Sequence, residues 1–138
     1  MSINTVPASR VTPEKIERLG EREIFVFGSS LMGVHFGDAA RVAYDKFGAG
    51  GVSEGLKGST YAIPVVRAGI DMVKPHIEVF LSFARSHTEY RFFVTRIGCG
   101  IAGFTDEDIA PLFAVAVGME HVTLPASFWE VLQRKGLY

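Results

Sequence analysis

Short apolar runs alternate along this chain with longer segments in which apolar residues recur at helical spacing. Four runs are predicted to be strands, at residues 24–27, 59–66, 91–97 and 121–124. The first run, Ile-Phe-Val-Phe, is apolar throughout, which is typical of a central parallel strand covered on both faces. Because Pro64 cannot donate a ladder hydrogen bond, it is expected near the end of its strand or at an irregularity.

The helices are predicted from apolar spacing together with capping residues. A short lead-in helix is expected to begin at Thr12, a good capping residue, and to close at Gly20. Longer helices are expected at residues 38–47, 72–87 and 108–117. Asp108 is expected to cap the third of these. Ser127 and Glu130 have the spacing of a capping box, which predicts that the last helix opens there.

This order, a helix followed by four strand–helix units, predicts a three-layer α/β/α fold with a mainly parallel central sheet. The chain has 138 residues, no internal repeat and no long linker, so a single domain over residues 1–138 is expected. In such folds the ligand crevice lies outside the carboxyl ends of the strands. Two glycine-rich loops, at residues 28–37 and 98–103, begin at predicted strand ends.

Composition narrows the range of partners. The chain has 14 basic and 15 acidic residues and a net charge of -1, which does not favour nucleic acid or an anionic membrane surface as a partner. No apolar run approaches the roughly 18 residues of a membrane span, so a cytoplasmic location is expected. With one cysteine and no histidine pair at metal-ligand spacing, neither a metal nor a resident cofactor is expected.

The first glycine-rich loop leads directly into the helix that begins at Asp38. Glycines let the backbone approach a ligand closely, and free N–H groups at a helix start favour phosphate. The candidate ligand-binding residues of this loop are Gly28, Ser29, Ser30, Gly33 and Gly37. Phosphate binding is not the only use for the free N–H groups at this helix start. Asp38 could instead accept from them as an ordinary helix cap, and its negative charge would then repel a phosphate placed there. His35 is a candidate general base, with an exposed loop histidine as the alternative.

The second glycine-rich loop holds three glycines in six residues. Its candidate ligand-binding residues are Gly98, Cys99, Gly100, Ile101, Ala102, Gly103 and Phe104. The alternative is that these glycines serve tight turns and close packing of a strand against a helix. Cys99 is a candidate nucleophile if nearby helix starts lower its pKa, and a small buried filler is the alternative.

Charged residues near the strand ends add two further candidates. Arg67 and Arg96 are placed to pair with a phosphate. Asp106, Glu107 and Asp108 have the character of a divalent-metal site, but negative charges are also favoured at a helix start without any metal. The helix-start interpretation is preferred.

Together, the two loops resemble those of the macro domain, a fold that binds ADP-ribose and related nucleotides. Macro domains carry Asn-Ala-Ala-Asn at a strand end, then a glycine-rich loop into a helix, and later a Ser-Thr-Gly-Ile-Tyr-Gly type loop. In this chain Phe27-Gly28-Ser29-Ser30 stands at the first position. The second position is taken by Gly98-Cys99-Gly100-Ile101-Ala102-Gly103-Phe104, whose Gly-Ile-x-Gly-aromatic portion is the best match.

The resemblance implies a role for most of these residues. The distal ribose or the diphosphate would be contacted by Ser29, Ser30, Gly33 and Gly37. Residues 100–104 would close over the ligand from the other side, with the ring of Phe104 against a sugar or base. Asp38 resembles the aspartate that activates a water or the distal ribose in hydrolytic macro domains.

The function expected from this resemblance is binding of ADP-ribose or a related nucleoside diphosphate. Hydrolysis of an ADP-ribosyl or phosphate ester is a further activity that the resemblance leaves open. The partner would be a small-molecule nucleotide or an ADP-ribosylated substrate. One alternative is a non-catalytic module that reads a nucleotide or modified protein, which is favoured by Ser30 in place of the asparagine. Another is an interaction or homo-oligomer-forming protein whose glycines are purely structural.

Overall fold

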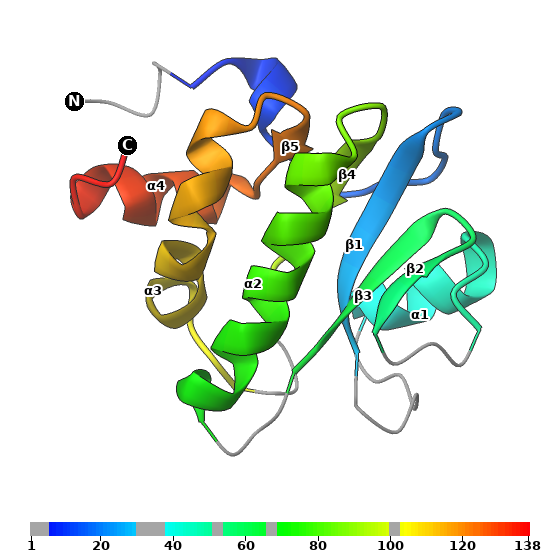
Figure 1. Ribbon diagram of the computed structural model, residues 1–138, viewed down its shortest axis with the longest axis horizontal. Coiled ribbons are helices and arrows are strands. Elements are labelled where there is room, and N and C mark those ends of the chain that lie inside the picture. The colour runs from blue at the N-terminus through cyan, green and yellow to red at the C-terminus, as the bar shows by residue number, and fades with distance from the viewer. Residues whose placement is uncertain (1–5, 30–37, 51–53, 66–68, 100–102) are drawn as a thin grey trace.

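The computed structural model describes residues 6–29, 38–50, 54–65, 69–99 and 103–138. It contains a five-stranded sheet in the order β2-β3-β1-β4-β5 (Figure 1). The strands are β1 (Glu23–Ser29), β2 (Gly55–Lys57), β3 (Thr60–Pro64), β4 (Arg91–Val94) and β5 (Val122–Thr123). Neighbouring strands run parallel except at one edge, where β2 pairs antiparallel with β3. The predicted α/β class with a mainly parallel sheet is therefore confirmed.

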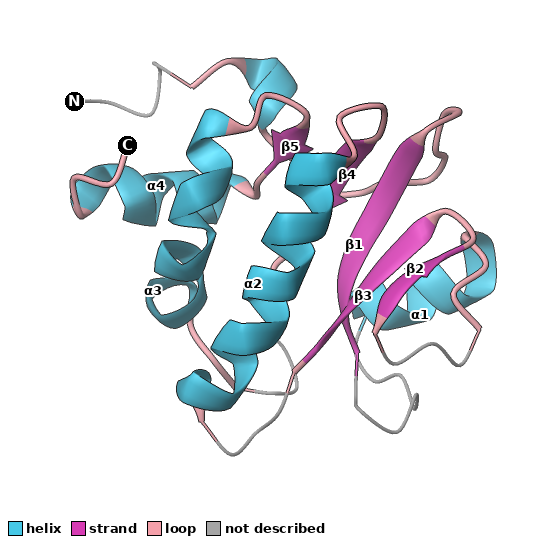
Figure 2. Ribbon diagram, in the orientation of Figure 1, coloured by secondary structure: helices cyan, strands magenta, loops and turns pink. Residues whose placement is uncertain are grey.

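Helices cover both faces of this sheet. One face carries α2 (Ile70–Ser86), α3 (Asp106–Ile109), the 3-10 helix η3 (Ala110–Gly118) and α4 (Ala126–Arg134), and the other carries α1 (Asp38–Lys46), as Figure 2 shows. Successive side chains of a strand point to opposite faces of the sheet, so β1 contributes to the apolar clusters on both faces. Ile24 and Val26 belong to the larger apolar cluster, whereas Phe25 and Phe27 join Ala43 of α1 in the smaller one.

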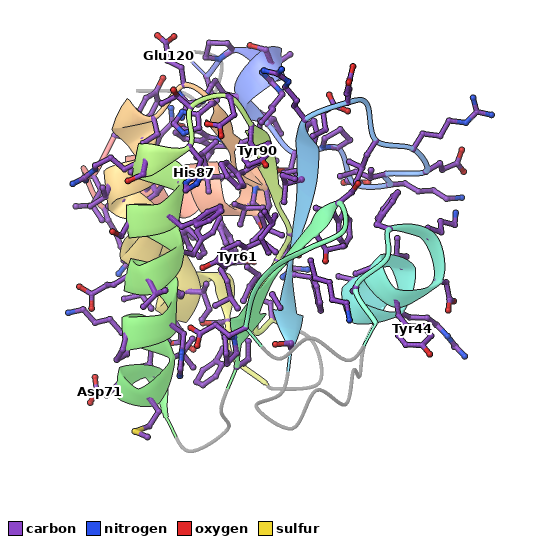
Figure 3. All side chains as sticks on the ribbon, turned by 45° about the vertical axis from the view of Figure 1, so that its right-hand side comes forward. Tyr44, Tyr61, Asp71, His87, Tyr90 and Glu120 are labelled. Atoms are coloured by element: carbon purple, nitrogen blue, oxygen red, sulfur yellow. The ribbon has the colours of Figure 1, made fainter. Side chains whose placement is uncertain are left out.

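The larger core is built on one side of α2. Its buried residues recur at helical spacing and are Val73, Ile77, Phe80, Leu81 and Ala84. The ring of Phe80 lies 5.0 Å from that of Tyr61 on β3 and 5.4 Å from that of Phe92 on β4. Figure 3 shows Tyr61 in the interface between α2 and the sheet. This helix therefore bridges two strands that are not neighbours, because β1 lies between them.

The strand predictions hold for type and position but not for every boundary. β4 ends at Val94, three residues earlier than predicted. The Thr95 N–H still donates across to β1 (3.1 Å), but the Ile97 N–H turns back to the Thr95 carbonyl (2.8 Å), which takes the chain out of the ladder. β2 was not predicted, because three residues that include Gly55 are too few to show apolar alternation. Pro64 is the last residue of β3, as expected.

The predicted lead-in helix at residues 12–20 is wrong. Between residues 6 and 22, all of which the structure describes, the one helical turn is η2 (Ala8–Arg10), and the chain then runs beside β5. Val11 forms a parallel bridge with Leu124, and the Thr12 N–H donates to the Leu124 carbonyl (2.9 Å). The Thr12 hydroxyl lies 2.7 Å from that of Thr123 inside the fold. Thr12 thus hydrogen-bonds residues that are distant in the sequence and does not cap a helix.

The helix predicted to start at Asp108 begins earlier and changes type. Thr105 caps α3, its hydroxyl accepting from the Asp108 N–H (3.2 Å) while the Asp108 carboxylate accepts from the Thr105 N–H (3.0 Å). Asp108 is therefore the returning member of a capping box and not the cap itself. From Ala110 the chain continues as a 3-10 helix, with Pro111 in its first turn.

The capping box predicted for the last helix is also wrong. α4 begins at Ala126 after Pro125, with no side-chain cap. The Ser127 hydroxyl donates instead to the Asp106 carboxylate, 3.0 Å away at the start of α3. A local signature was overridden here because a stronger, ionised acceptor lies within reach.

Arg10 links η2 to the end of η3, to β5 and to α4. Its guanidinium donates five hydrogen bonds of 2.9 to 3.4 Å to carbonyl oxygens of Ala116, Val117, Met119 and Val122. The carbonyls at the end of η3 carry the negative end of its dipole, which a cation stabilises. The guanidinium also stands over the ring of Trp129 at 5.3 Å, and the indole N–H donates to the Arg10 carbonyl (3.0 Å).

Replacing Arg10 with Met should lower the free energy of unfolding by about 2–4 kcal/mol, because several half-buried carbonyls lose a charged donor together. Chemical denaturation at unchanged m-value is the measurement. Arg18→Met is the matched control, since Arg18 is exposed, and should change stability by less than about 0.5 kcal/mol. Equal effects of the two substitutions would show that the Arg10 contacts contribute nothing specific.

Candidate functional site

The starts of the two glycine-rich loops lie side by side at the carboxyl edge of the sheet. β1 and β4 are parallel neighbours in which Val26 is level with Val94. Beyond that level, a Cβ built on Gly28 would lie 3.6 Å from the backbone nitrogen of Gly98. Figure 1 shows the ends of β1 and β3 at the same edge of the molecule. The carboxyl edge, meaning Gly28, Ser29 and residues 95–99, is therefore the candidate site.

Gly28 is required by packing at this edge. A Cβ at this position would lie 2.9 Å from Cγ2 of Val65 and 3.4 Å from Cγ2 of Ile97, which come from the chain after β3 and after β4. The strand continues through Ser29, which is buried and whose carbonyl accepts from the Val65 N–H (2.8 Å). The strand predicted over residues 24–27 therefore continues through Ser29.

Gly98 forms the base of the second loop. Its φ is +78°, a left-handed conformation that favours glycine, and a Cβ would lie 3.2 Å from the Phe104 ring and 3.3 Å from Cδ1 of Ile109. The Gly98 carbonyl accepts from the Phe104 N–H (2.9 Å), which closes the loop on itself. Phe104 is half-buried against the larger core, so its ring covers the loop base.

Several predicted site residues have no described placement. Those outside the described residues are Ser30, Gly33, His35 and Gly37 in the first loop, Gly100, Ile101 and Ala102 in the second, and Arg67. Asp38 is the first residue of α1, as predicted, but only its backbone is described. Gly103 has φ +83° and open space on its side-chain side. Among the predicted site residues that are described, the structure brings together Gly28, Gly98 and Phe104.

A polar cluster around Asp106 lies next to this edge. Arg96, just beyond β4, donates to the Asp106 carboxylate from Nε (3.0 Å) and Nη2 (2.9 Å). Ser127 of α4 donates to the same carboxylate, and so does the Cys99 thiol with a sulfur–oxygen distance of 3.6 Å. One carboxylate therefore ties together the end of β4, the start of α3 and the start of α4.

The hydrogen bonds of the cluster keep Asp106 ionised. Partial burial disfavours its charge, but the hydrogen bonds from Arg96 and Ser127 outweigh burial and hold the pKa of Asp106 below its usual value. The same contact with Asp106 raises the pKa of Arg96. Asp106 and Arg96 therefore form a fixed ion pair throughout the neutral range.

Cys99 is not set up as a nucleophile. Burial raises the pKa of its thiol to about 12, and the negative charge of Asp106 adds to that effect. Because the thiolate is the reactive form, a thiol with this pKa is almost entirely protonated near neutral pH. The possibility that helix starts lower this pKa is thereby corrected. Burial is the larger cause of the raised pKa, and the Asp106 carboxylate is the second.

The acidic run at residues 106–108 is accounted for without a metal. Asp106 accepts from Arg96, Asp108 completes the cap of α3, and Glu107 pairs with Arg134 of α4 at 2.5 Å. Within the ranges that the structure describes, no group of metal-ligating side chains gathers into an ion site. Each of the three carboxylates therefore has a partner within the protein, and Asp108 has the helix-start role.

Sequence reasoning found Arg96 as a phosphate candidate but missed its link to Ser127 through Asp106. Asp106 and Ser127 are 21 residues apart, and no local pattern connects them. The only available signal was that both stand at predicted helix starts. Helix starts in a parallel α/β fold gather at the carboxyl edge of the sheet.

Comparisons of this chain with protein-family models, with curated proteins and with solved structures found no match. Among the described helices, none combines the length and apolar character needed to cross a membrane.

Cys99 should react slowly with iodoacetamide, roughly 10²–10³-fold below the unfolded chain at pH 8, because so little thiolate is present. The rate should still be rising with pH above about pH 10, where an ordinary thiol is almost fully ionised and its rate has levelled off. Asp106→Asn should speed the reaction, since it removes the negative charge and leaves Arg96 to favour the thiolate.

Glu107→Gln is the control for this experiment, because it removes a neighbouring charge that does not contact the thiol. Alkylation followed by mass spectrometry across pH 7–11 measures the rates. A wild-type rate at pH 8 equal to that of the unfolded chain would contradict the raised pKa.

Proposed function

We propose that this chain binds ADP-ribose or a related nucleoside diphosphate at the carboxyl edge of its sheet. The observation that carries the proposal is the adjacency of Gly28 and Gly98, the first residues of the two glycine-rich loops. Loops that leave neighbouring parallel strands at one edge are the usual ligand-binding elements of α/β sheets. A ligand held between them contacts both loops at once.

The character of this edge favours a phosphate-bearing ligand. α1 begins at Asp38 directly after the first loop, and α4 begins at Ala126 near the second. The backbone N–H groups at such helix starts carry partial positive charge and attract phosphate. Arg96, paired with Asp106, supplies further N–H donors beside the second loop.

The choice of ADP-ribose among phosphate-bearing ligands rests on the resemblance to the macro domain. It is carried by the segment Phe27-Gly28-Ser29-Ser30 and by the Gly-Ile-x-Gly-aromatic portion of the second loop, which ends at Phe104. In this proposal the ligand diphosphate lies between the loops, and the half-buried ring of Phe104 bounds the site on the side of the core.

Hydrolysis of an ADP-ribosyl or phosphate ester is the catalytic form of this proposal, with Asp38 as the residue that activates water or the distal ribose. His35 is retained as a candidate general base. The second candidate function is a non-catalytic module that reads a nucleotide or an ADP-ribosylated protein. Ser30, which stands where the macro domain has asparagine, is the observation that favours the module.

Calorimetric titration with ADP-ribose, ADP and NAD tests the binding proposal directly. ADP-ribose should bind, and Gly103→Ala should weaken it roughly tenfold, because a side chain at positive φ strains the second loop by about 1–2 kcal/mol. Gly136→Ala is the matched control, since Gly136 also has positive φ and open space but lies after α4. Gly136→Ala should lower the free energy of unfolding about as much as Gly103→Ala does, without weakening the binding of ADP-ribose. No heat and no thermal shift at millimolar ligand would refute the proposal.

Asp38→Ala separates catalysis from binding. It should abolish release of ADP-ribose from an ADP-ribosylated protein while largely retaining affinity for free ADP-ribose, because the ligand contacts assigned to the loops are kept. Asp45→Ala, in the same helix, should leave both unchanged. Turnover that survives Asp38→Ala removes this residue from the mechanism. If the wild type binds ADP-ribose but releases none from the ADP-ribosylated protein, the result supports the non-catalytic binding module instead.

A further inference from the structure

Arg96 is held on one side and open on the other. It pairs side-on with Asp106 through Nε and Nη2, which uses two of the five N–H groups of a guanidinium. The other three have no partner among the residues that the structure describes. The Arg96 side chain is 57% exposed, whereas that of Asp106 is 23% exposed. Asp106 is therefore the more buried partner of the pair, and much of the Arg96 side chain is accessible to solvent.

Asp106 is itself held in place from two further sides. Ser127 donates to Oδ1 at 3.0 Å, and the Cys99 thiol lies 3.6 Å from the same atom. An arginine side chain normally samples many rotamers, and a side-on pair with a fixed carboxylate selects one of them. The open edge of Arg96 thus has a defined direction beside the base of the second loop.

The two carboxylates that follow Asp106 in the sequence have partners of their own. Asp106, Glu107 and Asp108 supply three negative charges, and Arg96, Arg134 and Lys135 supply three positive ones. Glu107 is paired with Arg134 and lies 3.9 Å from Lys135, and Asp108 is bound to the Thr105 N–H.

An exposed ion pair contributes little to stability, so stability alone is a weak reason for so constrained an arrangement. A planar guanidinium with a free edge is suited to the two oxygens of a phosphate. We propose that Arg96 contacts a phosphate or diphosphate group of the ligand through this edge, and that Asp106 is the positioning residue that orients it. The location of that group beside the second loop rests on the proposed function.

Inorganic pyrophosphate is the probe for this inference, because it carries the phosphate chemistry without a nucleoside. Phosphorus NMR titration should detect binding to the wild type at millimolar concentration. Arg96→Gln should weaken binding about tenfold or more, and Arg96→Lys should fall between, since lysine keeps the charge but lacks the fork. Arg91→Gln is the matched control, because Arg91 lies at the amino end of the same strand, and should change affinity less than about twofold.

Asp106→Asn tests whether Asp106 orients the Arg96 guanidinium or only adds a negative charge beside it. Removing a negative charge beside Arg96 should tighten anion binding if Arg96 acts as a loose point charge. If Asp106 orients the guanidinium, the same substitution should weaken binding several-fold. Thermal unfolding of each variant checks that it is folded under the titration conditions.

The outcomes separate this inference from the proposed function. Pyrophosphate binding that depends on Arg96 and Asp106 supports the inference, even where ADP-ribose fails to bind and the proposed function falls. Wild-type protein that does not bind pyrophosphate at about 50 mM, or Arg96→Gln protein that binds it equally well, overturns the role of Arg96. Tighter binding by Asp106→Asn overturns the positioning role of Asp106.

Discussion

The close approach of three strand ends over Gly28 is the constraint on which the carboxyl edge of the sheet depends. Val65 and Ile97 reach over this position from either side, and the Cβ of any other residue would lie 2.9 Å from Val65. Real Cβ atoms almost never lie this close to another atom, so Val65 or the backbone would have to shift to admit a side chain at this position. The glycine thus lets the chain segments after β3 and β4 pack closely over β1.

The polar contacts at this edge extend the same arrangement into the helical layer. Asp106 collects hydrogen bonds from the end of β4 and from the start of α4, and its own backbone begins α3. Burying part of a carboxylate is tolerated because each of its contacts is a donor. Burial keeps the Cys99 thiol protonated, and the negative charge of the same carboxylate adds to that effect.

The elements that could be predicted are those with a strong periodic pattern. The apolar run of β1 and the spacing of Ile77, Phe80 and Ala84 in α2 identified buried elements correctly, because burial of these faces is the dominant energy of the fold. The capping residues were less informative. Thr12 and Ser127 each resemble a cap in sequence, yet each hydrogen-bonds a residue distant in the chain. A hydroxyl bonds whichever acceptor is near it, and the sequence does not say which one that is.

The sequence by itself determined the class of fold, the parallel sheet and the chain positions of the two glycine-rich loops, because apolar periodicity and glycine placement are local properties. Only the tertiary structure decided that Gly28 and Gly98 adjoin, that Arg10 joins η2 to η3 and β5, and that Asp106 unites Arg96 with Ser127. These contacts join residues far apart along the chain. Their partners are selected by strand order and helix placement, which no local pattern encodes.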